Sequence, residues 1–161
     1  MEDDDFGFDF DDMSEEENEE FERRQREKDE WVRKHPLRKK ADEIFKVVSV
    51  FNESLTGEAK EMYEGLLMES ALIINGKLAG ALGCDSWLLC MQNASLIRYH
   101  AEYLHTATSG LKAFDGADKN YVQVLRTTMQ EFRELFKEWV KTFDSLEKEE
   151  YTDEWGLFLR D

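Results

Sequence analysis

The chain has 161 residues, of which 41% are apolar, and it carries a formal net charge of −16. This length can bury one sizeable core but leaves no room for two domains of ordinary size. So acidic a chain repels phosphate backbones and anionic lipid, which makes nucleic acids and membranes poor default partners. No uncharged apolar run approaches the roughly 18 to 20 residues of a membrane helix, and the residues after Met1 are acidic, unlike a secretory signal. We therefore expect a cytoplasmic protein with no membrane partner.

Residues 1–13 interleave aromatic and acidic side chains, with Phe6, Phe8 and Phe10 spaced two apart. The segment is too charged to fold alone, and we expect it to be disordered in isolation. In an extended strand the three rings would lie on one side, which suggests a short docking motif for a protein partner. The alternative interpretation is a solubilising tail.

Residues 14–35 are typical of a charged helix. Ser14 and Glu17 form a capping box, and acidic residues at the start with basic residues at the end suit the helix dipole. Acid–base pairs spaced four residues apart support an isolated helix; they are Glu19 with Arg23, Glu20 with Arg24, Glu22 with Arg26, and Glu30 with Lys34. Only Phe21, Trp31 and Val32 could pack, so we favour a solvated helix over one that lies on the bundle by a single seam.

The only proline, Pro36, separates this charged helix from a heptad pattern. Proline suits the first turn of a helix and disfavours helical geometry in the residue before it, so the charged helix should stop at His35. Apolar steps of three and four then predict a bundle helix that ends at Gly57 as a C′ residue. Its inward residues are Leu37, Ala41, Ile44, Val48, Phe51 and Leu55.

Three more amphipathic helices are predicted, over about 58–83, from Ser86 to near Gly110, and after a turn at 115–118. Their inward residues are, in chain order, Met62, Tyr63, Leu66, Ser70, Ile73, Ile74 and Ala81; Cys90, Asn93, Ile97, His100, Leu104, Ala107 and Leu111; and Tyr121, Leu125, Thr128, Phe132, Phe136, Trp139 and Phe143. Short loops between long helices require antiparallel neighbours. The sequence thus predicts an all-α fold: an antiparallel up-down-up-down four-helix bundle over 36–144, with an extra charged N-terminal helix and extended acidic tails.

Residues 145–161 lose the heptad and form an acidic tail that contains Trp155 and Phe158. Apolar residues at this density are seldom left in water. We expect the tail to dock on its own bundle, with a neighbouring subunit as the alternative, and we count both residues as candidate partner contacts.

Three polar residues fall within the apolar stripes: Lys77, Asn93 and His100. A buried amine without a partner costs several kcal/mol, so Lys77 should reach the end of the bundle or meet an acceptor. We interpret the three as a buried polar layer that fixes helix register; a small ligand pocket is the alternative.

Small residues and cysteines gather at the end of the second bundle helix. Gly76, Gly80 and Gly83 weaken a helix, so we expect a close helix approach there, within the bundle or between subunits. Cys84 and Cys90 have no further Cys or His at metal spacing, which argues against a disulfide framework or a zinc site. We expect reduced, buried thiols and no metal or other cofactor.

Two other functions remain as alternatives. Glu102 and His105 have the Glu-x-x-His spacing of carboxylate-bridged di-metal oxidases, but they lie about 160° and 100° from Leu104 on the helix and do not project together into the core. The chain has no second such motif. Residues 23–40 hold nine basic residues against three acidic ones, which would suit an RNA- or DNA-associated accessory protein.

The stretch from Leu78 to Ser86, followed by a long amphipathic helix, resembles the junction of the second and third helices in the four-helix bundle proteins encoded in ribosomal RNA intervening sequences. Accessory proteins of diversity-generating retroelements are similar. The match covers about residues 37–144 and rests on Ala79, Gly83 and Ser86; where that family shows an Asn and a Glu-Gly pair, this chain has Lys77, Gly80 and Ala81. Residues 108–112, 132–144 and 153–158 also resemble an uncharacterised group of bacterial four-helix bundle proteins.

The resemblance implies a homo-oligomeric bundle, often pentameric, that contacts a protein or nucleic-acid partner through its surface. In those relatives the nucleic-acid face is basic, which this bundle lacks. We therefore expect a non-enzymatic, homo-oligomeric protein-interaction or scaffold module, with the aromatic residues of the two tails as its candidate contacts.

Overall fold

The computed structural model describes residues 14–148, so the sequence-based expectations for residues 1–13 and 149–161 lie outside it. The described residues contain five α-helices and a short 3₁₀ helix, and no strand. The helices are α1 (Glu15–Lys34), α2 (Pro36–Ser54), α3 (Gly57–Ala81), α4 (Trp87–Leu111), α5 (Lys119–Lys141) and η2 (Thr142–Ser145). Within this part of the chain, no helix is both long and apolar enough to cross a membrane.

The chain divides after Trp31 into two compact units. In the first unit the capping box at the start of α1 is confirmed: the Ser14 N–H donates to a Glu17 carboxylate oxygen at 2.9 Å, and the Glu17 N–H donates to Ser14 Oγ at 3.3 Å. The predicted pairs Glu20–Arg24 and Glu22–Arg26 also form. The prediction of a charged helix here is therefore confirmed.

Pro36 begins α2, as predicted. His35 before it is extended, with φ −61° and ψ 133°, and its Nδ1 accepts a hydrogen bond from the Leu37 N–H at 3.2 Å. Proline leaves the preceding residue little freedom to be helical, so the chain breaks its helical geometry at His35. The imidazole then caps the new helix as an acceptor, a role that the sequence did not suggest.

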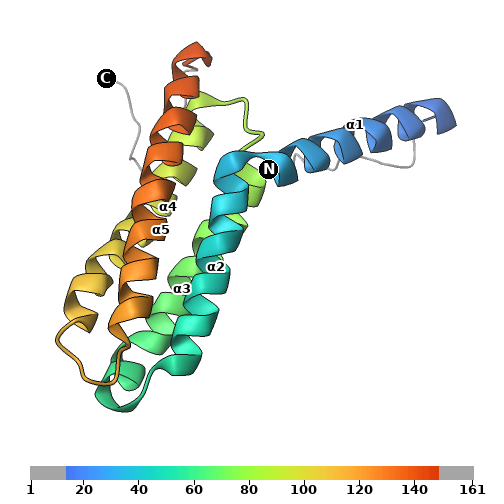
Figure 1. Ribbon diagram of the computed structural model, residues 1–161. Helices are drawn as coiled ribbons and strands as arrows, with labels where there is room; N and C mark the ends of the chain where they lie inside the picture. The colour runs from blue at the N-terminus through green and yellow to red at the C-terminus, as the bar shows by residue number, and fades with distance from the viewer. Residues whose placement is uncertain (1–13, 149–161) are drawn as a thin grey trace, which may run out of the picture. The chain divides into compact units, whose positions relative to one another are not determined.

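Helices α2 to α5 form the predicted antiparallel bundle (Figure 1). Each helix packs against the two that neighbour it around the bundle: α3 lies between α2 and α4, and α5 lies between α4 and α2. The loops are short, so each helix runs back along the one before it.

The heptad positions predicted for α2 are confirmed, since all six of its inward residues are buried. Leu125, Phe132 and Trp139 on α5 and Phe143 in η2 are buried, and ring contacts run from Phe132 through Phe136 and Trp139 to Phe143. The aromatic side chains of the last bundle helix and of η2 therefore form part of the core.

The inward stripe predicted for α3 is wrong in part. Met62 and Leu66 lie on the surface, whereas Leu67, Ala71 and Leu78 are buried in their place. Apolar residues occur around most of the circumference of this helix, so two stripes about 100° apart both fit the steps of three and four. Packing against α2 and α4 selects one stripe and leaves the other facing outward.

Two turn expectations also need correction. Cys84 and Cys90 form a disulfide across the α3–α4 turn, with Cα atoms 5.9 Å apart, where reduced thiols were expected. The turn brings the ends of the two helices together, which sequence spacing alone does not reveal. Gly57 does have a left-handed φ of 57°, but it lies at the start of α3, because α2 already ends at Ser54.

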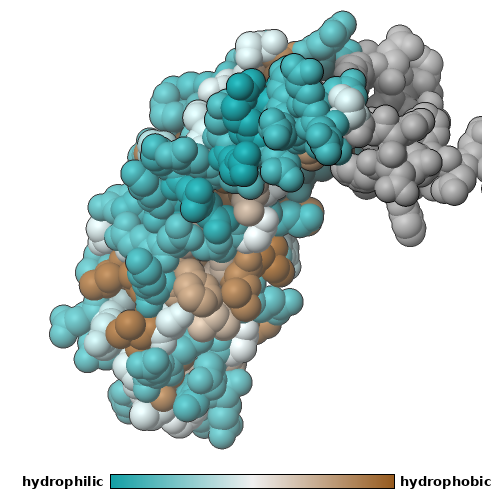
Figure 2. All heavy atoms as spheres, turned by 90° about the vertical axis from the view of Figure 1, so that its right-hand side faces the viewer, coloured by the Kyte–Doolittle hydropathy of each residue, from teal (hydrophilic) through white to brown (hydrophobic). Residues whose placement is uncertain are grey.

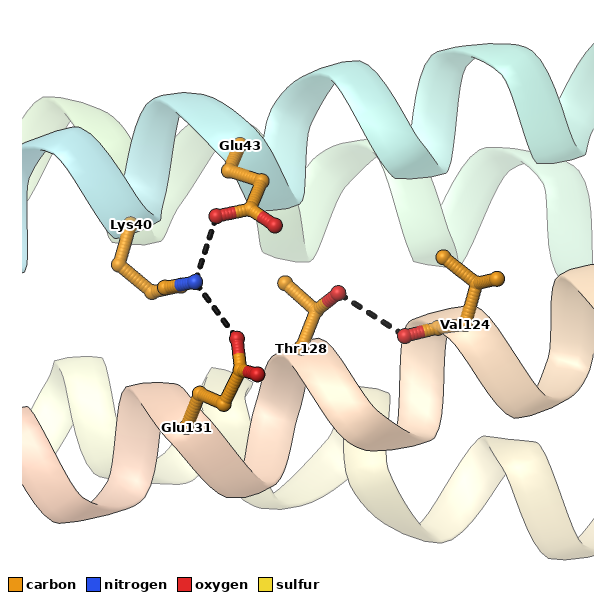
Figure 3. A network of polar contacts seen from close by, with 5 residues as sticks. All are labelled: Lys40, Glu43, Val124, Thr128 and Glu131. Carbon is orange, nitrogen blue, oxygen red and sulfur yellow. Dashed lines mark hydrogen bonds and ion pairs between the residues drawn. The ribbon is translucent and has the colours of Figure 1, made fainter.

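An ion-pair network ties α2 to α5. The Lys40 amine lies between two carboxylates and donates to Glu43 and to Glu131, both at 2.6 Å, while Thr128 on α5 donates its hydroxyl to the Val124 carbonyl at 2.9 Å (Figure 3). Burial by itself disfavours the charged amine, but the hydrogen bonds to Glu131 and Glu43 raise the pKa of Lys40. The network therefore holds a charged lysine in place between two helices.

Candidate interaction site

The three residues of the predicted polar layer do not share one environment. Lys77 is exposed, so its amine needs no buried partner. Asn93 is half-buried and donates to the Leu89 carbonyl of its own helix at 2.9 Å. His100 Nδ1 lies 3.1 Å from Ser70 Oγ, a hydrogen bond that joins α4 to α3. Of the three predicted residues, only His100 makes a polar contact between α3 and α4, through Ser70, and Lys77 takes no part in it.

Glu102 and His105 do not project together into the core, as the helical angles predicted. Glu102 is exposed and pairs with Arg98 at 3.5 Å, whereas His105 is half-buried. Burial lowers the pKa of His105, and the charges of Arg133 and Arg126 lower it further. Between residues 14 and 148, no three His, Cys, Asp or Glu side chains are placed together to hold a metal ion.

The outward stripe of α3 and a matching stripe of α4 form an apolar surface, here named the α3–α4 face. It consists of Met62, Leu66 and Ile73 on α3, and Leu89, Leu96, Tyr99 and Tyr103 on α4. Met62 is 56% exposed, Leu66 49%, Leu89 51%, Leu96 46% and Tyr99 70%, while Ile73 and Tyr103 are half-buried. Single exposed apolar residues are ordinary, but a gathered set marks an interaction surface.

Helical geometry places both stripes on the same side. At 100° per residue, Met62, Leu66 and Ile73 lie within about 40° of one another, and so do Leu89, Leu96 and Tyr103. The Ser70–His100 hydrogen bond shows which flank of each helix meets the other, and each stripe lies on that flank, further outward. The two stripes therefore border the outer side of the α3–α4 seam.

Two glycines lie on the exposed side of the same helix. A Cβ atom added at Gly76 or Gly80 would meet no atom within 4 Å. The close helix approach predicted for these glycines is therefore not made inside the bundle.

The side of the bundle formed by α2 and α3 faces the viewer in Figure 2, where hydrophobic side chains interrupt a hydrophilic surface in the lower half of the view. Val50 on α2 and Leu72 on α3 are about half exposed. Leu72 lies about 120° around α3 from Leu66. Apolar exposure on α3 is thus not confined to one flank.

A groove of about 230 Å³ lies between α4 and α5, here named the α4–α5 groove. Its floor is apolar and its rim is charged; the lining residues are Ala101, Met129, Phe132 and Phe136, and Arg98, Glu102, Arg133 and Lys137. Three basic residues and one acidic residue give the rim a net positive charge, although Arg98 pairs with Glu102, Lys137 pairs with Glu134, and the protein as a whole is strongly negative. Sequence reasoning missed this groove, because its two walls lie some thirty residues apart in the chain.

Several of the basic residues in segment 23–40 have partners within the protein. Arg38 donates to the Asn75 carbonyl and lies 3.5 Å from the Asp42 carboxylate, and Lys40 is held by two glutamates. In α1, Arg24 and Arg26 pair with glutamates one turn away. Bases that already have carboxylate partners attract phosphate weakly, since those pairs must first be broken.

Comparison of the chain with protein-family models, curated proteins and solved structures finds no match. The resemblances drawn from the sequence therefore remain predictions.

Proposed function

We propose that this protein is a non-enzymatic, homo-oligomeric interaction module whose subunits associate through the α3–α4 face. The supporting observation is that face: seven apolar residues on two adjacent helices, with five of them about half exposed or more. The candidate contacts for a further protein partner remain the aromatic residues of the two tails, namely Phe6, Phe8 and Phe10, and Trp155 and Phe158. All five lie outside the described part of the chain.

The energetics favour a second copy as the occupant of the face. Full burial of a Leu or Met side chain contributes about 1.5 to 3 kcal/mol, so each half-exposed residue has roughly 1 kcal/mol still to gain. A two-fold contact would bury the same residues on both subunits and double this gain. Gly76 and Gly80 would then allow close approach of the neighbouring helix, which gives their presence in α3 a reason.

Charge predicts how association depends on salt. Each subunit carries a net charge of −16, so two copies repel one another at low ionic strength. The seven residues that define the α3–α4 face are apolar, so salt does not screen the contact energy of their side chains. Association should therefore strengthen as salt is added, the reverse of nucleic-acid binding.

Sedimentation equilibrium of the full chain tests the proposal. Leu66→Glu or Leu96→Glu should shift the protein toward monomer, because each buries a charge in the contact. Leu72→Glu is the matched control: it introduces the same charge on α3 at a residue of similar exposure that lies outside the face. A wild-type protein that stays monomeric at high concentration and high salt would contradict the proposal, as would equal effects of Leu66→Glu and Leu72→Glu.

A cytoplasmic location stays part of the proposal, and the Cys84–Cys90 disulfide provides a test of it. Disulfides are uncommon in reducing compartments. Alkylation of free thiols during cell lysis, followed by mass spectrometry, would count the reduced cysteines. Two free thiols fit the cytoplasm, whereas an intact disulfide favours an oxidising compartment.

A further inference from the structure

We propose that the α4–α5 groove binds the chain's own C-terminal segment, residues 149–161, with the Trp155 ring on its apolar floor and the neighbouring carboxylates at its basic rim. This inference concerns a different surface from the α3–α4 face and does not depend on self-association.

The groove is suited to an aromatic side chain flanked by acids. Phe132 and Met129 are buried and Phe136 is half-buried, so the floor offers ring and thioether surface at limited depth. Arg98, Arg133 and Lys137 are exposed around it. An indole would gain both aromatic contacts and a cation over its face.

The C-terminal segment has the complementary composition. Five acidic residues stand against one basic residue, Arg160, and Asp153 and Glu154 directly precede Trp155. Carboxylates next to the ring would meet the rim bases while the ring enters the groove. Complementary charge of this kind selects one partner over another.

The described chain ends at a suitable place. After η2, which packs against α4 and α5, the Lys148 amine lies 5.2 Å from the centroid of the Trp87 ring, at the start of α4. Arg98 lies eleven residues further along α4, which corresponds to about 16 Å at 1.5 Å per residue. Trp155 follows Lys148 by seven residues, and an extended chain of that length reaches about 23 Å. The tail is therefore long enough to bring Trp155 to the groove.

The test uses the full chain labelled with ¹⁵N-tryptophan. The protein has four indole N–H groups, and Trp155→Phe identifies the Trp155 signal in an NMR spectrum. We expect this signal to lie away from its random-coil position and to return there in Arg133→Glu/Lys137→Glu. The matched control is Lys39→Glu/Lys46→Glu, which makes the same charge change at exposed lysines of α2 and should leave the signal in place.

Three results would overturn the proposal: a wild-type Trp155 signal at its random-coil position, equal responses to the two double variants, or a signal that changes on dilution. The last result would mean that the tail occupies the groove of a second copy. Thermal melts of all variants verify that the bundle stays folded. Leu66→Glu should dissociate the oligomer and leave the Trp155 signal unchanged, so the two proposals can fail separately.

Discussion

The Thr56 N–H donates a hydrogen bond to the Gly116 carbonyl oxygen at 3.0 Å, and this bond joins the α2–α3 turn to the α4–α5 turn. A Cβ atom added at Gly116 would collide with the Thr56 carbonyl oxygen, which is backbone and cannot rotate away. The absence of a side chain at Gly116 is what lets the two turns meet.

Gly116→Ala should therefore destabilise the bundle by about 1 to 3 kcal/mol, the usual cost of forcing extra volume into a packed site. Urea unfolding followed by circular dichroism measures the change. Gly65→Ala is the control, because a Cβ there meets nothing within 4 Å; in mid-helix it should stabilise the protein by up to about 1 kcal/mol. Equal effects of the two substitutions would contradict the proposed role of Gly116.

The Cys84–Cys90 disulfide closes a short loop between α3 and α4. On the loop-entropy model a loop of this size contributes about 2 kcal/mol. Cys84→Ser/Cys90→Ser should lower the free energy of unfolding by that order under oxidising conditions. A thiol reductant should lower the free energy of unfolding of the wild type by the same amount and leave that of the variant unchanged. This comparison separates the effect of the disulfide from the effect of the substitutions themselves.

His35 should make stability depend on pH near neutrality. Burial lowers the pKa of His35, and its Nδ1 accepts the capping hydrogen bond, which a proton there would remove. Because the unfolded chain binds the proton more readily, this contribution is complete above the unfolded pKa of about 6.5 and is lost as the pH falls below it. The pKa of His105 is also lowered, so His105 likewise makes the folded protein less stable as the pH falls.

His35→Ser keeps a capping acceptor without a titrating group. Urea midpoints measured at about pH 7.5 and about pH 5.5 should then differ less for the variant than for the wild type. His105→Gln in the same background should remove much of the remaining difference. An unchanged pH dependence in His35→Ser would show that the imidazole cap does not titrate with folding.

Lys40 and Glu131 should couple α2 to α5. The Lys40 side chain is only 17% exposed, whereas Glu131 is about half exposed, so solvent screens part of the interaction. A double-mutant cycle with Lys40→Met and Glu131→Gln should give a coupling energy of about 0.5 to 1 kcal/mol. The same cycle on the exposed pair Lys141–Glu138 should give less, and a larger coupling there would contradict the argument from burial.

The helices of this bundle could be predicted where the apolar pattern allows one interpretation. On α2 and α5 most of the apolar residues lie on one side, with Val50 and Val124 as exceptions, so the heptad identified the core directly. On α3 the pattern allows two stripes, and the one that faces outward, with Met62 and Leu66, became the candidate interaction surface. The sequence held the residues of that face but did not indicate that they are exposed.

Local chemistry determined the boundary at Pro36, the Ser14 helix cap and the antiparallel order of the helices, because each depends on residues that are neighbours in the chain. Only the tertiary structure decided which stripe of α3 is buried, that Cys84 and Cys90 meet, and that Arg98 and Arg133 border one groove. Those outcomes depend on distances between helices, which are set by how all four pack together and are not contained in the pattern of any one of them.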